Sequence, residues 1–201
     1  MFNCDCMDFM RDCDKYDLAI VDPPYGININ MNQGRRSGDT IKHKKKNWDN
    51  NTPDEIYFKK LFLISKNQIV WGANNFELPP SNGWIVWDKD ITGDVQFSKA
   101  ELAYSNIRNT VDMVKIRAQT GSETYSNKIH PTQKPVQLYK WLLTNYAKEG
   151  DTILDTHGGS MSIAIACWDL GFDLDICELD TDYFNDAVKR FENHISQTQL
   201  F

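Results

Sequence analysis

The chain has 201 residues, a formal net charge of −6 at pH 7 and a hydrophobic content of 41%. This composition suits one α/β domain with a sizeable core and argues against global disorder. The negative charge argues against a protein that coats nucleic acid non-specifically, although a local basic patch is compatible with it. No apolar stretch is long enough to cross a membrane and the N-terminus shows no signal-peptide pattern, so we expect a cytoplasmic protein.

The cysteines do not indicate a metal centre. There are five of them, an odd number, and no two form a Cys-x-x-Cys pair. Reduced, partly buried thiols are therefore expected, and no metal site is predicted.

Residues 2–16 predict a short helix between two strands, with Met7 and Met10 on one face. Residues 17–25, Asp-Leu-Ala-Ile-Val-Asp-Pro-Pro-Tyr, then predict a short buried strand that ends at Asp22. The two prolines have no N–H to donate, so they end the strand.

This acidic turn has the groups needed to bind an amine. Asp22 and the carbonyl of Pro23 could together accept the two hydrogens of an exocyclic amino group. Tyr25 offers a flat face on which a base could stack. The alternative interpretation is an ordinary acidic, proline-rich turn.

Residues 26–52 are rich in Asn, Gly and Ser and contain a run of basic side chains, without periodicity. This composition predicts a long loop, and a basic loop beside a candidate site suits contact with phosphates. The candidate DNA contacts are Arg35, Arg36, Lys44, Lys45 and Lys46. A solvated run of charges is the alternative.

The middle of the chain predicts one helix and three strands. The helix covers residues 53–66, with Thr52 as its cap and Ile56 in its apolar stripe. Strands are expected at 68–71, 84–87 and 111–117.

Residues 151–178 have the pattern of a nucleoside-binding βαβ unit. A buried strand ends at Asp155, a glycine turn at 158–160 opens a helix, and a second strand ends at Glu178. Glu178 stands 19 positions after Gly159, close to the offset of about 20 at which an acid binds a ribose in such units. No Gly-Lys-Ser/Thr follows, so the turn is not a triphosphate loop. A nicotinamide-dependent oxidoreductase has a similar unit, but it leaves the Pro-Pro-Tyr turn unexplained.

Three motifs together resemble those of the S-adenosylmethionine-dependent DNA amino-methyltransferases. They are Asp22-Pro23-Pro24-Tyr25, then His130-Pro131-Thr132-Gln133-Lys134-Pro135, then the glycine turn. The Asp-Pro-Pro-Tyr form resembles the adenine N6 enzymes more than the cytosine N4 enzymes, in which Ser-Pro-Pro is usual. The order, with the catalytic motif before the cofactor motif, resembles the permuted branch often called the beta class.

The resemblance implies a Rossmann-like methyltransferase fold of the α/β class, with a single mostly parallel sheet and helices on both faces. It implies one domain over residues 1–201, in which a catalytic half (about 1–127) precedes a cofactor half (about 128–195) and a mobile basic loop covers about 27–52. It also implies S-adenosylmethionine as the cofactor and double-stranded DNA as the partner, with no membrane. A homodimer stays open.

The resemblance further implies roles for single residues. The catalytic turn consists of Asp22, Pro23, Pro24 and Tyr25. Lys134 is expected to meet the carboxylate of the cofactor, and Asp5 and Cys6 match a pair near its adenine. The full set expected to bind the cofactor is Asp5, Cys6, Thr132, Lys134, Asp155, His157, Gly158, Gly159, Ser160 and Glu178.

The glycine turn departs from the family's usual Asp-Pro-Phe-x-Gly-Ser-Gly. Thr156 replaces Pro, His157 replaces Phe, and Met161 stands where a last Gly is common. This departure leaves open a DNA- or cofactor-binding relative that no longer transfers methyl. Among enzymes, transfer to cytosine N4 is the second interpretation, because base choice depends on the shape of the pocket.

Overall fold

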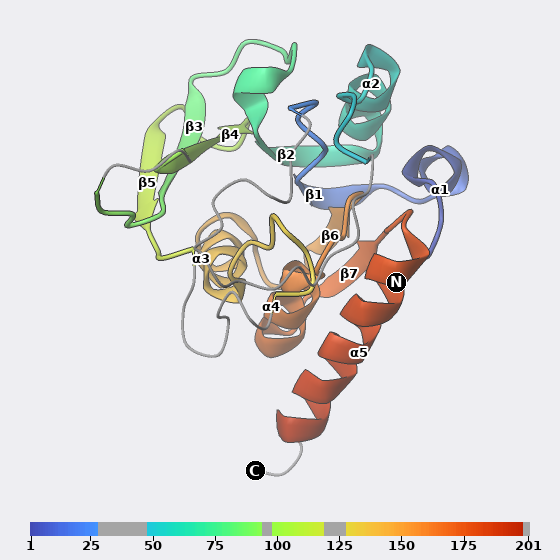
Figure 1. Cartoon of the computed structure of the whole chain (residues 1–201). Helices are drawn as coiled ribbons and strands as arrows, with labels where there is room; N and C mark the ends of the chain where they lie inside the picture. The colour runs from blue at the N-terminus through green and yellow to red at the C-terminus, as the bar shows by residue number, and fades with distance from the viewer. Residues whose placement is uncertain (28–47, 94–97, 119–127, 199–201) are drawn as a thin grey trace.

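The structure is a computed structural model that describes residues 1–27, 48–93, 98–118 and 128–198 (Figure 1). The predicted DNA contacts Arg35, Arg36, Lys44, Lys45 and Lys46 lie outside the described residues. Within the described part of the chain, no helix is both long enough and apolar enough to span a membrane.

The described strands form one seven-stranded sheet in the order β5-β3-β4-β2-β1-β6-β7. Only β4 runs antiparallel to its neighbours, and the pairs β1–β2, β1–β6, β6–β7 and β3–β5 are parallel. The strands are β1 (Tyr16–Val21), β2 (Ser65–Trp71), β3 (Gly83–Asp88), β4 (Ala100–Ser105), β5 (Val111–Lys115), β6 (Thr152–Asp155) and β7 (Asp173–Ile176).

Helices cover both faces of the sheet, as Figure 1 shows. On one face lie α1 (Cys6–Asp12) and α2 (Glu55–Ile64); on the other lie α3 (Val136–Tyr146), α4 (Ser162–Leu170) and α5 (Thr181–Thr198). A 3-10 turn, η1 (Ala73–Asn75), follows β2. The predicted α/β fold, with a single mostly parallel sheet and helices on both faces, is confirmed.

The alternation of side chains along the central strand explains the two layers. In β1, Leu18 and Ile20 face the core under α3, α4 and α5, whereas Ala19 and Val21 face the core under α1 and α2. All four are buried, because a central strand between two helical layers has no solvent face.

The order of the strands reverses between β1 and β6. From β1 the chain goes to its neighbour β2 on one side, and from β6 it goes to β7 on the other side. Such a point is where open parallel sheets bind ligands, just beyond the carboxyl ends of the strands. Because Ala19 pairs with Leu154, the residues that follow these two strands emerge at the same edge.

Three local predictions differ from the structure. Asp54, not Thr52, caps α2, because its carboxylate accepts a hydrogen bond from the N–H of Tyr57 at 2.9 Å. The shorter helix also has a different phase, so Tyr57 is buried and Ile56 is 63% exposed. The predicted strand 68–71 is longer in the structure, because β2 begins at Ser65.

Candidate active site

The acidic turn leaves the end of β1 and is fixed by a residue that the sequence did not identify. The carboxylate of Asp49, itself buried, accepts hydrogen bonds from the backbone N–H groups of Tyr25 (2.9 Å) and Gly26 (3.0 Å). Asp49 lies near the far end of the predicted basic loop in the sequence. It therefore ties that end of the loop to the turn.

Tyr25 lies flat against the backbone of Gly72. A Cβ atom added at Gly72 would lie 2.1 Å from Cε1 of the Tyr25 ring, so only glycine leaves room for the ring. The hydroxyl of Tyr25 donates to Oδ1 of Asp22 at 2.6 Å. Burial and the nearby carboxylates of Asp22 and Glu101 raise the pKa of Tyr25 well above its usual value, so the hydroxyl stays a donor.

The second oxygen of Asp22 binds a buried lysine. Lys134 Nζ lies 2.5 Å from Oδ2 of Asp22 and 3.1 Å from Oε2 of Glu101, and its side chain is 3% exposed. Lys89 binds the other oxygen of Glu101 at 2.5 Å. Burial alone would raise the pKa of Glu101, but Lys134 and Lys89 together lower it to about 2.

The segment 130–134 joins the acidic turn to the glycine turn. At one end its Lys134 binds Asp22, and at the other end the ring of His130 lies 3.8 Å from where a Cβ atom on Gly159 would stand. Thr132 Oγ1 lies 3.1 Å from Nδ1 of His130, which orients this ring. The predicted catalytic and cofactor motifs are therefore brought together at the reversal point of the sheet.

The glycine turn approaches β7 closely. Gly158 N–H donates to the carbonyl of Cys177 at 2.7 Å, and a Cβ atom on Gly158 would lie 3.0 Å from a side-chain carbon of Ile176. Gly159 has a φ of +52°, in the left-handed region that glycine favours. Arg190, from α5, donates to the carbonyl of Ser160 at 2.8 Å and so supports the end of the turn.

Glu178 is prepared to accept hydroxyl groups. Its two carboxylate oxygens accept from the backbone N–H groups of Gly159 (2.7 Å) and Asp180 (2.8 Å). These bonds fix the plane of the carboxylate. An acid with this orientation can accept both hydroxyls of a ribose.

Asp155, which is buried, and His157, which is half-buried, lie beside the glycine turn and have opposite pKa shifts. Burial raises the pKa of Asp155 to about 8, despite a bond from the N–H of His157. Burial lowers the pKa of His157 to about 4, so its ring is neutral near pH 7. The ring packs edge-on against Tyr57, and its Nδ1 lies 2.9 Å from Oγ1 of Thr156.

The N-terminal residues lie against the end of β7. Phe2 N–H donates to the carbonyl of Ile176 (2.8 Å), and the N–H of Glu178 donates to the carbonyl of Phe2 (3.0 Å). This bridge brings Asp5 and Cys6 to the Glu178 side of the site. Asp5 caps α1 through the N–H of Met7 (2.7 Å), and burial raises the pKa of Cys6 to about 12, so Cys6 is a thiol. The Asp5 carboxylate is thus committed in part to its own helix.

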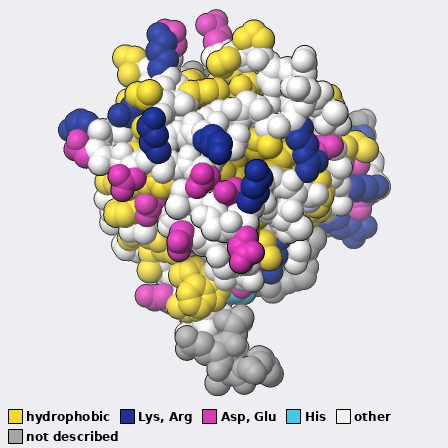
Figure 2. Space-filling view, turned by 180° about the vertical axis from the view of Figure 1, so that it is seen from behind, with side chains coloured by type: hydrophobic (Ala, Val, Ile, Leu, Met, Phe, Trp, Pro, Cys, Tyr) yellow, Lys and Arg dark blue, Asp and Glu magenta, His cyan; other side chains and the backbone are white. Residues whose placement is uncertain are grey.

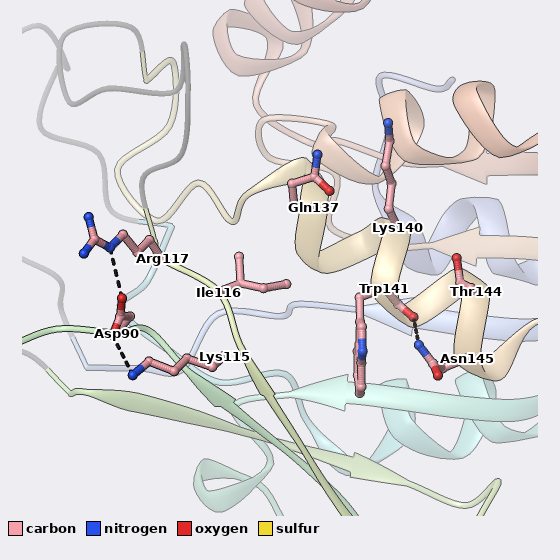
Figure 3. A pocket seen from close by; sticks show the side chains of 9 residues that line it. All are labelled: Asp90, Lys115, Ile116, Arg117, Gln137, Lys140, Trp141, Thr144 and Asn145. Carbon is pink, nitrogen blue, oxygen red and sulfur yellow. Dashed lines mark hydrogen bonds and ion pairs between the residues drawn. The ribbon is translucent and has the colours of Figure 1, made fainter.

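A separate cavity of about 620 Å³ lies between β5 and α3 (Figure 3). On one wall, Asp90 binds Lys115 at 2.8 Å and Arg117 at 3.0 Å. The opposite wall is formed by α3, with Gln137, Lys140 and Trp141. The two cations of the first wall are already paired with an acid. Figure 2 shows acidic and basic side chains interspersed among the described residues on the face opposite to that of Figure 1.

Four residues of the cluster were missed from the sequence: Asp49, Gly72, Lys89 and Glu101. Asp49, Gly72 and Glu101 contact the turn from other segments, and Lys89 binds Glu101. The signal in the sequence was that Gly72 and Lys89 closely follow the predicted strands 68–71 and 84–87.

Asp155 makes the stability of the protein depend on pH. Its folded pKa of about 8 lies above the ordinary value of 3.8, so stability falls as the pH rises through this interval. Asp155→Asn removes the cost of ionising this buried carboxyl group. The variant should therefore gain unfolding free energy relative to the wild type, and the gain should be larger at pH 8 than at pH 5 by up to about 4 kcal/mol. Urea denaturation at the two pH values measures it. The control is Asp186→Asn on the exposed face of α5, and an equal gain at both pH values would contradict the buried acid.

The comparisons with known proteins agree with this geometry. The model of a DNA methylase family, N6_N4_Mtase, matches residues 34–189. No curated protein sequence matches the chain. Members of this family use S-adenosylmethionine as the methyl donor.

Solved structures share the fold at low sequence identity. The M1.HpyAVI–SAM complex has 17% identity and a TM-score of 0.59, with 94% of this chain and 98% of that chain covered. The cytosine-N4-specific PvuII DNA methyltransferase has 12% identity and a TM-score of 0.63, with 98% and 89% covered. A provisional DNA modification methylase of Thermus thermophilus, complexed with S-adenosyl-L-methionine, has 14% identity and a TM-score of 0.54, with 96% and 94% covered.

The family model covers most of the chain, and the residues that it matches include the glycine turn. The chain belongs to the N6/N4 DNA methylase family.

Proposed function

We propose that this protein transfers a methyl group from S-adenosylmethionine to N6 of adenine in DNA. The observation that carries this proposal is the bridge formed by residues 130–134. It joins the amine-binding turn at Asp22 to the nucleoside-binding turn at Gly159 at one edge of the sheet, where a donor and an acceptor can meet.

The residues around the glycine turn fit the methyl donor. Glu178, fixed by two backbone donors, accepts the ribose hydroxyls, and Gly158 and Gly159 leave room for close approach of the ligand. Asp155 lacks a strong cationic partner, as its raised pKa indicates, and the ammonium group of the donor's methionine part would supply one. The neutral ring of His157 adds no positive charge beside a cationic ligand.

The remaining predicted cofactor residues surround these groups. Thr132 and Ser160 belong to the segments that meet at the glycine turn, and Asp5 and Cys6 approach from the side of Glu178. We keep them as proposed contacts, with Cys6 as an uncharged thiol and Asp5 as a helix cap that retains a further oxygen.

At the other side of the site, Asp22 and the carbonyl of Pro23 accept the two hydrogens of the target amino group, and Pro24 keeps the turn rigid. These two hydrogen bonds draw the nitrogen lone pair out of conjugation with the ring and direct it toward the methyl carbon. S-adenosylmethionine, when bound, would supply a methyl group on a sulfonium sulfur, so that the new C–N bond would form as the C–S bond breaks and its electron pair returns to sulfur. The surplus proton on the nitrogen leaves through the Asp22 carboxylate. Most of the rate gain comes from positioning.

The base must leave the duplex before it can reach this turn, at a cost of about a few kcal/mol. Tyr25, seated on Gly72, gives the extruded base an aromatic contact. Arg35, Arg36, Lys44, Lys45 and Lys46 follow the turn in sequence and are proposed to contact the phosphates.

Adenine is favoured over cytosine by the Asp-Pro-Pro-Tyr form of the turn. Cytosine N4 is the second candidate, because the PvuII enzyme, whose fold is similar, is cytosine-N4-specific. Sequencing DNA from cells that express the protein, with detection of modified bases, decides between them. We expect N6-methyladenine at a fixed sequence; N4-methylcytosine would replace the proposal by its alternative, and unmodified DNA would support a relative that only binds.

Asp22→Ala separates chemistry from binding. Without this carboxylate the amine loses its acceptor, so the rate of methyl transfer should fall by about 10³-fold or more. The dissociation constant for S-adenosylmethionine should change little, because the glycine turn is intact. Tritium-methyl transfer and calorimetry measure the two quantities, and an equal loss of both would count against the role of Asp22.

Gly72→Ala tests the seat of Tyr25. The added methyl overlaps the ring, which must move away from Asp22, so methyl transfer should fall by about 10²-fold. Gly171→Ala is the matched control: its φ of +74° is close to the +67° of Gly72, but nothing lies within 4 Å of its added Cβ. Both variants lose about 1 kcal/mol of stability to backbone strain. Equal activity in the two would show that the position of the ring does not matter.

A further inference from the structure

We propose that Lys134 is a positioning residue, whose ammonium, anchored by Glu101, orients the carboxylate of Asp22 toward the amino group of the substrate. This role differs from the one expected from the sequence, in which Lys134 meets the carboxylate of the cofactor. The inference rests on the proposed methyl transfer for its effect on rate, but its geometry does not depend on that function.

The donors of Lys134 are fully used inside the protein. An ammonium group has three N–H donors. Nζ of Lys134 has three oxygen partners: Oδ2 of Asp22 at 2.5 Å, Oε2 of Glu101 at 3.1 Å and the hydroxyl oxygen of Tyr25 at 3.3 Å. No donor is left for the carboxylate of a ligand, and only 3% of the side chain is exposed.

Aromatic rings close the space around the ammonium. Nζ lies 5.5 Å from the centre of the Trp71 ring and 5.7 Å from that of Tyr25, which are cation–π distances. Trp71 is fully buried. To reach a ligand, Lys134 would have to leave two carboxylates and two ring faces, and no other cation bound to Asp22 in the described site would compensate the charge left behind.

Glu101 is the second acid that binds the ammonium. Lys89, Glu101, Lys134 and Asp22 form a chain of ion pairs whose charges sum to zero. Burial alone would lower the pKa of Lys134, but Asp22 and Glu101 raise it above its usual value, so Lys134 remains an ammonium. Its position is therefore set before any ligand arrives.

Asp22 needs this contact in order to act as an acceptor. Its Oδ1 already accepts from Tyr25 and its Oδ2 from Lys134, so the carboxylate plane is fixed while each oxygen keeps one lone pair. The groups that face it are Lys134, Tyr25 and, by their charge or burial nearby, Glu101, Asp155 and Tyr139. Lys134 is the cation among these, and without it Asp22 would face two other acids.

The test compares Lys134→Met, Glu101→Gln and the double variant Lys134→Met/Glu101→Gln with the wild type. The double variant removes one charge of each sign and so keeps the net charge of the site unchanged if the single lysine variant fails to fold. Lys59→Met, at an exposed lysine of α2 that pairs with Glu55, is the matched control.

Three measurements are made on each protein. Calorimetry gives the dissociation constant for S-adenosylmethionine, a single-turnover assay with saturating DNA and cofactor gives the transfer rate, and the same assay over a range of pH gives the rate–pH profile. For Lys134→Met we expect a dissociation constant within about threefold of wild type and a transfer rate lower by about 10²-fold. The acidic limb of the rate–pH profile should move to higher pH, because the site has lost its buried cation. Glu101→Gln should lower the rate less, and the double variant should show the same shift of the rate–pH profile.

The opposite result would overturn the proposal. A large rise in the dissociation constant with an unchanged saturated rate would assign Lys134 to the cofactor, and an unchanged rate–pH profile would show that the ammonium does not act on Asp22. If the wild type transfers no methyl, the proposed function fails, but the dissociation constants still decide whether Lys134 binds the cofactor.

Discussion

The ion pair between Lys134 and Asp22 is the contact on which the site depends. It joins residues 112 positions apart and links the end of β1 to the beginning of α3. Removing two charges from water is costly, and their attraction repays the cost only when the remaining donors and acceptors are satisfied. Glu101, Lys89 and the hydroxyl of Tyr25 satisfy them here. The pair therefore fixes the geometry of the site more than it adds to the stability of the protein. Removal of one member alone would leave a buried charge without a partner.

The sheet makes this contact possible. Parallel strands end at one edge, and the reversal of strand order between β1 and β6 opens that edge between their two connecting segments. The acidic turn stands before the glycine turn in the chain, yet the two are neighbours in space, because β6 inserts beside β1. The order of motifs along the chain thus has little influence on the site. The pairing of β1 with β6 influences the site strongly, because a shift of its register by one residue would turn Asp22 to the other face of the sheet.

Much of this arrangement follows from the sequence, for a physical reason. The strand before Asp22, the glycine turn and the offset to Glu178 are local patterns, and each is an element whose shape its own residues determine. The residues that were missed act over long distances: Asp49 binds the turn from across the basic segment, and Glu101 arrives from a strand of the antiparallel part of the sheet. Lys134 was recognised by its motif, but its pairing with Asp22 and Glu101 was not predicted, because an ion pair between distant segments has no sequence pattern. The predicted cap of α2 was wrong for a local reason. Thr52 and Asp54 are both good N-cap residues, and only the position at which the helix begins decides between them.

The departures at the glycine turn are consistent with a turn that keeps its shape. Met161 has a φ of +53°, so the family's usual glycine stands at a position that needs left-handed backbone. Such a residue costs about 1–2 kcal/mol, but burial of a Met side chain returns about 1.5–3 kcal/mol, and Met161 is completely buried. Thr156 and His157 replace an apolar pair by a hydrogen-bonded one, in which the hydroxyl of Tyr57 lies 2.6 Å from that of Thr156. Because His157 stays neutral and Arg190 supports Ser160, the backbone amide of Gly159 still reaches Glu178. The unusual residues therefore change what stabilises the turn, while the hydrogen bond from the Gly159 N–H to Glu178 is kept.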